Sequence, residues 1–82
     1  MVIFSESRSI KSSLYGKGHA LEQDIYETDH KRRFLRKNDL INQLESYGFT
    51  IENVIESDGL ALYQDDDPVV IRISARKSYN IQ

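Results

Sequence analysis

Residues 38–51 read NDLINQLESYGFTI, and this stretch determines the predicted fold. Four of its apolar residues recur at the spacing of one helix face: Leu40, Ile41, Leu44 and Tyr47. Asn38 can accept hydrogen bonds from the exposed amides of a first helical turn, and Gly48 is the residue type that ends helices in the left-handed conformation. The pattern predicts a helix from about Asn38 to Tyr47, with a strand over residues 49–56 directly after it.

Two further apolar runs predict strands. Residues 2–4 (VIF) are typical of a buried strand that opens into a polar loop, and residues 69–75 (VVIRISA) are rich in β-branched side chains. Asp58-Gly59 indicates a turn or a bulge, and extended structure is predicted over residues 60–63. The acidic run that ends at Pro68, residues 65–68, indicates a turn before the last strand.

The predicted order is strand, long loop, helix, strand, turn, strand, which indicates the α/β class. Residues 9–30 show no clean period and are interpreted as a long connection with a short helical turn at 20–26. The helix allows a crossover that returns the second strand beside the first, and the last two strands are antiparallel. We therefore predict a small three-stranded mixed sheet with one main helix. The apolar residues of 69–73 on the uncovered face need cover from elsewhere.

Length and composition limit what the chain can be. Its 82 residues allow a single small α/β domain or partial domain over residues 1–77, with 78–82 as a frayed polar tail. The sequence has no cysteine, which excludes disulfides, thiolate metal sites and cysteine nucleophiles and favours the cytoplasm. No apolar run approaches the roughly 20 residues of a membrane span, so no contact with a membrane is expected.

The charge is unevenly distributed along the chain. Residues 1–37 carry eight Lys or Arg against five Asp or Glu, whereas residues 38–82 carry three against eight. Residues 30–37 alone hold five of the basic side chains. Such a cluster indicates either a surface that meets an anionic ligand or an ordinary solvated face.

Several stretches together resemble one known family. Residues 38–51 look like the last helix and the following strand of a class I S-adenosylmethionine-dependent methyltransferase. The similarity extends to four more stretches: residues 14–18 (LYGKG), 29–34 (DHKRRF), 59–61 (GLA) and 66–72 (DDPVVIR). The resemblance implies that the strand after the helix is the family's sixth strand. It also implies that residues 69–77 form a seventh strand, which runs antiparallel.

The chain departs from this family in one important respect. The family binds its cofactor with a glycine-rich turn after the first strand and an acidic residue at the end of the second, and neither is present. The pair of glycines in residues 16–18 is no substitute, because it does not lie between a strand and a helix. The resemblance therefore implies the C-terminal, acceptor-side part of such an enzyme. S-adenosylmethionine would need residues outside this chain, such as those of an N-terminal methyltransferase half.

Three residues near the basic cluster are candidates for recognising the methyl acceptor. Guanidinium groups bind carboxylate or phosphate through two parallel hydrogen bonds, so Arg32 and Arg33 are predicted to bind a small anionic acceptor. The alternative is that both are solvated charges beside the helix. Histidine is the side chain best suited to proton transfer near neutral pH, so His30 is a candidate catalytic base or acceptor contact, and the alternative is a surface or structural histidine.

Three more substrate-binding candidates lie earlier in the chain. Glu6 and Arg8 follow the first strand, at the end of an open α/β sheet where ligands bind. Tyr15 can close over a substrate, and the ordinary alternative is an aromatic ring that packs its loop down. No metal site is predicted, because His19 and the acidic residues after it match no recognised ligand pattern.

A non-catalytic binding module is the alternative function. In that interpretation, the basic cluster of residues 30–37 binds nucleic acid or an acidic protein. The acidic second half of the chain would repel a duplex, and only Phe34 is interleaved with the basic residues, so nucleic acid is the weaker candidate. Formation of a homo-oligomer that hides an exposed sheet edge is compatible with either function.

Overall fold

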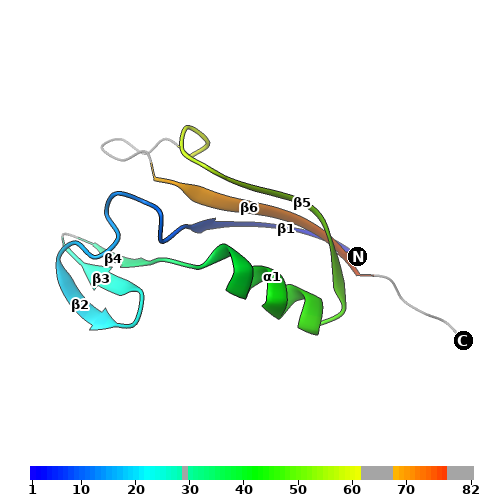
Figure 1. Ribbon diagram of the computed structural model, residues 1–82, viewed down its shortest axis with the longest axis horizontal. Coiled ribbons are helices and arrows are strands. Elements are labelled where there is room, and N and C mark those ends of the chain that lie inside the picture. The colour runs from blue at the N-terminus through cyan, green and yellow to red at the C-terminus, as the bar shows by residue number, and fades with distance from the viewer. Residues whose placement is uncertain (29, 62–67, 78–82) are drawn as a thin grey trace, which may run out of the picture.

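The computed structural model describes residues 1–28, 30–61 and 68–77. This part of the chain contains one helix and six strands. The strands form two three-stranded sheets, with the orders β1-β6-β5 and β2-β3-β4 (Figure 1). The elements are β1 (Val2–Arg8), β2 (His19–Glu22), β3 (Ile25–Glu27), β4 (Lys31–Arg33), α1 (Lys37–Ser46), β5 (Phe49–Ser57) and β6 (Val70–Lys77). The predicted mixed α/β composition is thereby confirmed.

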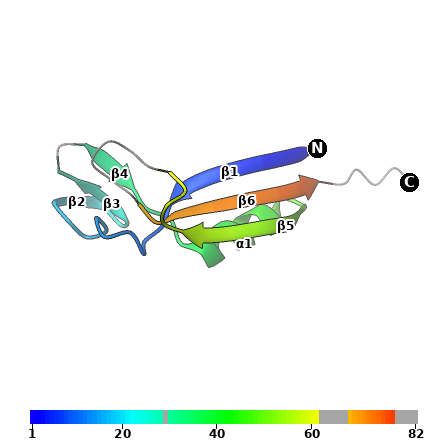
Figure 2. The ribbon, with the colours of Figure 1, turned by 90° about the horizontal axis from the view of Figure 1, so that it is seen from above.

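The larger sheet has β6 at its centre, between β1 and β5, and α1 lies against one face (Figure 2). β6 is antiparallel to both neighbours, which confirms the predicted pairing of the last two strands. The prediction that β5 lies beside β1 was wrong, because β6 lies between them. The predicted mixed sheet was also wrong, because both pairs of neighbouring strands are antiparallel. β6 carries three side chains with no exposed surface, Ile71, Ile73 and Ala75, and the central position shields them from both edges.

The helix begins and ends within one residue of the predicted bounds. Arg36 is its N-cap, with an extended backbone and no side-chain cap, so the prediction that Asn38 caps the helix was wrong by two positions. Gly48 has a φ of 88°, and its amide donates to the Glu45 carbonyl oxygen at 3.0 Å, as expected for a helix stop. Tyr47 is 62% exposed and lies outside the core. None of the described residues form a helix long and apolar enough to cross a membrane.

The core lies between α1 and the inner face of the larger sheet. Half-buried side chains from both layers pack on the three buried β6 residues, and they include Ile3, Leu40, Leu44, Phe49, Ile51 and Val54. The register of β5 shifts between Ile51 and Asn53. This bulge keeps Val54 facing inward and leaves Ile55 43% exposed, which explains why the two break strict alternation in the sequence.

The smaller sheet occupies much of the predicted long connection. The short helical turn expected at residues 20–26 was wrong, because β2 and β3 form an antiparallel hairpin there, and β4 adds to β3. Asp24 lies in the hairpin turn with a φ of 62°. A parallel bridge between Ser9 and Leu35 joins the end of β1 to the segment that leads from β4 into α1.

Other expectations had mixed outcomes. The face of β6 turned away from α1 carries Arg72, Ser74 and Arg76, so it is more polar than the sequence predicted. Residues 58–61 form bends, which agrees with the turn predicted at Asp58-Gly59 but not with the extended structure predicted to begin at residue 60. The rest of the predicted 60–63 segment, the acidic run at 65–67 and the tail at 78–82 lie outside the described residues.

Candidate functional site

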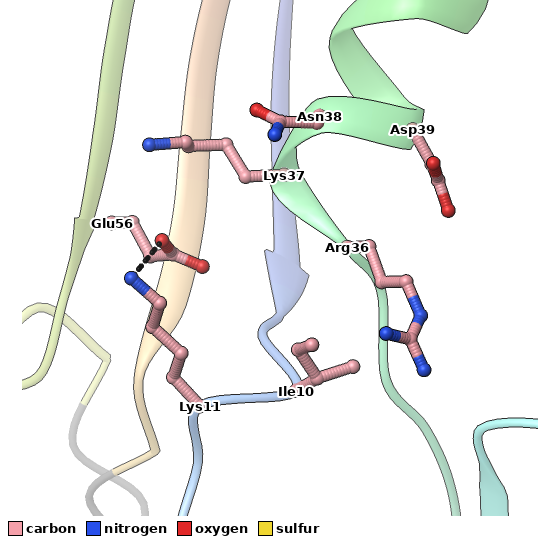
Figure 3. Close-up of a pocket in the computed structure, with 7 residues that line it drawn as sticks. All are labelled: Ile10, Lys11, Arg36, Lys37, Asn38, Asp39 and Glu56. Carbon is pink, nitrogen blue, oxygen red and sulfur yellow. Dashed lines mark ion pairs between the residues drawn. The ribbon is translucent and has the colours of Figure 1, made fainter.

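A pocket of about 370 Å³ lies where α1 begins and β1 and β5 end (Figure 3). Its lining comes from the loop after β1, from the first turn of α1 and from the end of β5: Ile10, Lys11, Arg36, Lys37, Asn38, Asp39 and Glu56. These residues belong to segments far apart in the sequence. The pocket therefore exists only when β1, α1 and β5 are packed together.

The most buried polar group of the pocket is the carboxylate of Glu56, whose side chain is 7% exposed. The Ser9 hydroxyl donates to Glu56 Oε2 at 2.5 Å, and Lys11 Nζ lies 3.2 Å from Oε1. Burial by itself raises the pKa of Glu56. The Ser9 hydrogen bond and the positive charges of Lys11 and Lys37 outweigh burial, so the pKa is lower than usual. Glu56 is consequently a buried anion at neutral pH.

The basic residues of the pocket point to different sides. Lys11 and Lys37 extend toward Glu56, whereas Arg36 points away from it (Figure 3). Lys11 is paired with Glu56, and Arg36 is paired with Asp24. Among the described residues, Lys37 forms no ion pair and is the pocket cation best placed to meet a ligand.

Arg36 also belongs to a network that fastens the smaller sheet to the start of α1. Its Nη2 lies 3.1 Å from Asp24 Oδ1 and 3.3 Å from the Tyr15 hydroxyl, and its Nε lies 3.2 Å from Asp24 Oδ2. The Tyr15 hydroxyl donates to Asp24 Oδ1 at 2.6 Å. This hydrogen bond raises the pKa of Tyr15 to about 12. Tyr15 and Arg36 together lower the pKa of Asp24.

Tyr15 is at the same time part of an aromatic cluster. Its ring meets the edges of Tyr26 and Phe34, with centroid distances of 5.3 and 5.5 Å. Phe34 is 1% exposed. Such edge-to-face contacts favour one fixed arrangement of the rings. Tyr15 therefore packs the loop after β1 against the smaller sheet.

The other candidates from the sequence are spread over both sheets. Glu6 accepts from Arg72 Nε at 2.6 Å, and Arg32 Nη1 donates to Thr28 Oγ1 at 2.8 Å. Two of the remaining three, His30 and Arg33, are exposed around β4, and the third, Arg8, ends β1. None of the six lines the pocket beside α1. Tyr15 comes closest to the pocket, because its hydroxyl lies 3.3 Å from Nη2 of Arg36, which is one of the lining residues.

Sequence reasoning missed most of the residues of the pocket. Arg36 and Lys37 were included in the basic cluster, but nothing in a single sequence separates them from their neighbours. Glu56 was treated as part of a strand, and its burial depends on the bulge in β5. In the described part of the chain, no group of three or more His, Asp and Glu side chains is placed to hold a metal ion.

The hydroxyl of Tyr15 gives the network a pH dependence that can be measured. Its pKa in the folded chain, about 12, exceeds the ordinary value of 10.0. Its contribution to stability is therefore complete below pH 10 and is lost as the pH rises through 12. We expect one of the five tyrosines to ionise last in an ultraviolet titration. Tyr15→Phe should remove that step together with the extra alkaline destabilisation, whereas Tyr47→Phe should remove neither.

No protein-family model, curated protein or solved structure matches this chain. A function for it must therefore be derived from its own residues: the pocket beside α1, the network around Asp24 and the direction of the strands. Of these, the pocket is the feature that combines an open hollow of about 370 Å³, a buried ionised carboxylate and cations that can turn toward a ligand.

Proposed function

We propose that this chain is the acceptor-side segment of a class I S-adenosylmethionine-dependent methyltransferase, in which the pocket beside α1 binds an anionic group of the methyl acceptor. One observation carries the proposal. The pocket lies at the shared carboxyl ends of β1 and β5, two strands that run in the same direction. Open α/β sheets bind their ligands at the carboxyl ends of such strands.

The order and direction of the elements also support the proposal. The sequence resemblance implies a strand, then a helix that leads into a second strand of the same direction, then an antiparallel last strand. β1, α1, β5 and β6 follow one another in that order, and β6 is antiparallel to both β1 and β5. The smaller sheet lies in the connection between β1 and α1, next to the pocket.

The charges around the pocket favour an anionic acceptor. Lys37 has no ion pair among the described residues, and Lys11, 68% exposed, can turn from Glu56 toward a ligand. Both ammonium groups can donate to carboxylate or phosphate oxygens. Glu56 limits how deeply an anion can enter, because its own negative charge lies at the inner side of the pocket. The ligand class is therefore a small molecule with an exposed carboxylate or phosphate group.

The described residues do not fit S-adenosylmethionine by themselves. The turn after β1 holds no glycine that would let the backbone approach the cofactor closely. Gly16 and Gly18 lie between two strands, β1 and β2, and not between a strand and a helix. Cofactor binding would therefore come from another segment or another chain. The contribution of this chain is to hold and orient the acceptor.

The alternative module that binds nucleic acid through residues 30–37 has less support. Phe34, the aromatic residue of that cluster, is 1% exposed and cannot stack on a base. Two of the arginines are engaged within the chain, Arg32 with Thr28 and Arg36 with Asp24. The positive charge available to a nucleic acid is smaller than the sequence suggests.

The proposal is tested by amide NMR with inorganic phosphate and acetate as probes. We expect shifts centred on Lys11, Lys37 and Glu56. Lys37→Ala should weaken phosphate binding by about fivefold, the effect of losing roughly 1 kcal/mol from one partly exposed charge. Addition of S-adenosylmethionine should cause no shifts, since the residues for it lie elsewhere.

Arg33→Ala is the matched control, because Arg33 is an exposed cation of the same cluster on β4. It should leave phosphate binding unchanged if the pocket is the site. Shifts that centre on β4 and disappear in Arg33→Ala, but not in Lys37→Ala, would contradict the pocket and return the acceptor site to Arg33. Tight binding of S-adenosylmethionine would refute a cofactor site outside the chain.

A further inference from the structure

The hydrogen bonds of β1 show which of its backbone groups face the open edge of the larger sheet. The Met1 amine donates to the Lys77 carbonyl oxygen, and the Ser9 amide donates to the Val69 carbonyl oxygen. Hydrogen-bonded pairs alternate along an antiparallel ladder. The odd-numbered residues of β1 therefore bond to β6, and the even-numbered ones direct their N–H and C=O groups outward. Among the residues that the structure describes, Figure 2 shows no strand on that side of β1.

The open stretch is limited at one end. Leu35 donates to the carbonyl oxygen of Arg8 at 2.7 Å and so occupies the edge at the end of β1. The residues that still offer both outward groups are Val2, Phe4 and Glu6. Free edges of this kind are usually protected by a proline, a bulge or a charged side chain. The stretch has no proline and no bulge, and its charged side chain is that of Glu6.

The outward-facing residues also carry exposed apolar side chains. Phe4 is 67% exposed and Val2 is 57% exposed, and both lie on the face of the sheet away from α1. Glu6, on the same face, is already paired with Arg72. An edge with unpaired backbone groups and an exposed phenyl ring is suited to meet another strand.

We propose that β1 pairs antiparallel with β1 of a second copy of this chain, about a two-fold axis that passes between the two Phe4 residues. In this register, Val2 lies opposite Glu6 of the second copy, and each facing pair exchanges two hydrogen bonds. The two sheets become one continuous six-stranded sheet. The phenyl rings meet directly across the axis, where aromatic cross-strand pairs are favourable.

Two features favour this register over one with the axis at Glu6. An axis at Glu6 would set two carboxylates opposite each other and would push the incoming strand against Leu35. With the axis at Phe4, no like charges face each other. Val2 pairs with Arg76 of β6 within its own sheet. In the dimer, Val2 therefore lies between Arg76 and the Glu6 of the second copy, and one strand separates the two charges. The two edges are therefore complementary in hydrogen bonding, and the register sets no like charges opposite each other.

The expected dimer is weak. One strand edge and a pair of phenyl groups bury less than the roughly 1,200 Å² of a stable interface. Sedimentation over about 10 µM to 1 mM covers the affinities of interfaces this small. We expect the mass to rise from that of one chain to that of two. Phe4→Lys should remain monomeric and folded throughout. Tyr47→Lys, which changes a similarly exposed aromatic residue directly after α1, should dimerise like the unmodified chain.

A single introduced cysteine tests the register, since the sequence has none of its own. On the axis, the two copies of residue 4 lie about 5.5 Å apart, within the Cα separation of a disulfide. Phe4→Cys should therefore form a covalent dimer under mild oxidation. Val2→Cys is the control, because its two copies would be separated by about 14 Å along the strands.

Three outcomes would overturn the proposal. The first is a monomeric chain over the whole concentration range, and the second is a dimer that Phe4→Lys leaves intact. The third is equal crosslinking of Val2→Cys and Phe4→Cys, which would refute the register. None of these measurements involves the pocket beside α1, so the phosphate titration stands or fails separately.

Discussion

Ile73→Asp is expected to abolish the folded state of the chain. Ile73 has no exposed surface and lies on the central strand, within the cluster that α1 covers. A buried carboxylate without a partner costs several kcal/mol, and even a protonated one loses its hydrogen bonds to water. Small domains have only about 5–15 kcal/mol of stability, and a chain of this length lies at the lower end. The amide NMR spectrum should collapse to the narrow dispersion of an unfolded chain.

Two further variants show whether the loss comes from the core. Ser74→Asp places the same charge on the next residue of β6, which faces away from α1, and it should fold. Ile73→Val removes one methylene group and should cost about 0.5–1.5 kcal/mol in a urea titration. A soluble Ile73→Asp protein with dispersed amide signals would contradict the arrangement of the larger sheet.

Gly18→Ala is expected to dismantle the smaller sheet. Gly18 has a φ of 85°, and an added Cβ would overlap the Glu27 carbonyl oxygen and lie 2.6 Å from Thr28 Cγ2. To relieve this overlap, either the backbone at Gly18 or the Glu27 carbonyl group must move. Either movement would separate the start of β2 from the end of β3. We expect a loss of at least about 2 kcal/mol in unfolding free energy, because the backbone strain and the overlap with the carbonyl oxygen act together.

Gly16→Ala separates the clash from the backbone conformation. Gly16 has nearly the same φ, 81°, but its Cβ would meet nothing within 4 Å. It should cost only the roughly 1–2 kcal/mol of a left-handed residue with a side chain. Amide exchange of Tyr26 should accelerate strongly in Gly18→Ala and much less in Gly16→Ala. Equal effects in both variants would show that contact with β3 is unimportant.

The predictable parts of the fold are those with a long, regular pattern. The helix and the two long strands β5 and β6 were found, because apolar residues recur in each at the period of its structure. The smaller sheet was not found, because its strands have only three or four residues and most of their side chains are exposed. Its hairpin turn also depends on a positive φ at Asp24, a conformation that is uncommon in residues other than glycine.

The order of the strands in the larger sheet was the other failure. The crossover rule places β5 beside β1, but it takes no account of a later strand that competes for the same position. β6 occupies the centre and carries the buried side chains of the sheet, Val70, Ile71, Ile73 and Ala75. The pocket could not be predicted for a related reason. Glu56, Lys11 and Lys37 become neighbours only through that strand order, and no local pattern records it.

The central position of β6 has a consequence for how the sheet assembles. β1 and β5 do not touch each other as neighbours, and each depends on β6, which follows every other described element in the sequence. Glu6 and Arg72, paired across the β1–β6 ladder, are 66 positions apart. During synthesis, the apolar side chains of β1 therefore stay exposed to water until nearly the whole described chain has left the ribosome. The pairing of β1 with β6 therefore comes late in synthesis, and it closes the longest loop among the described strand pairings.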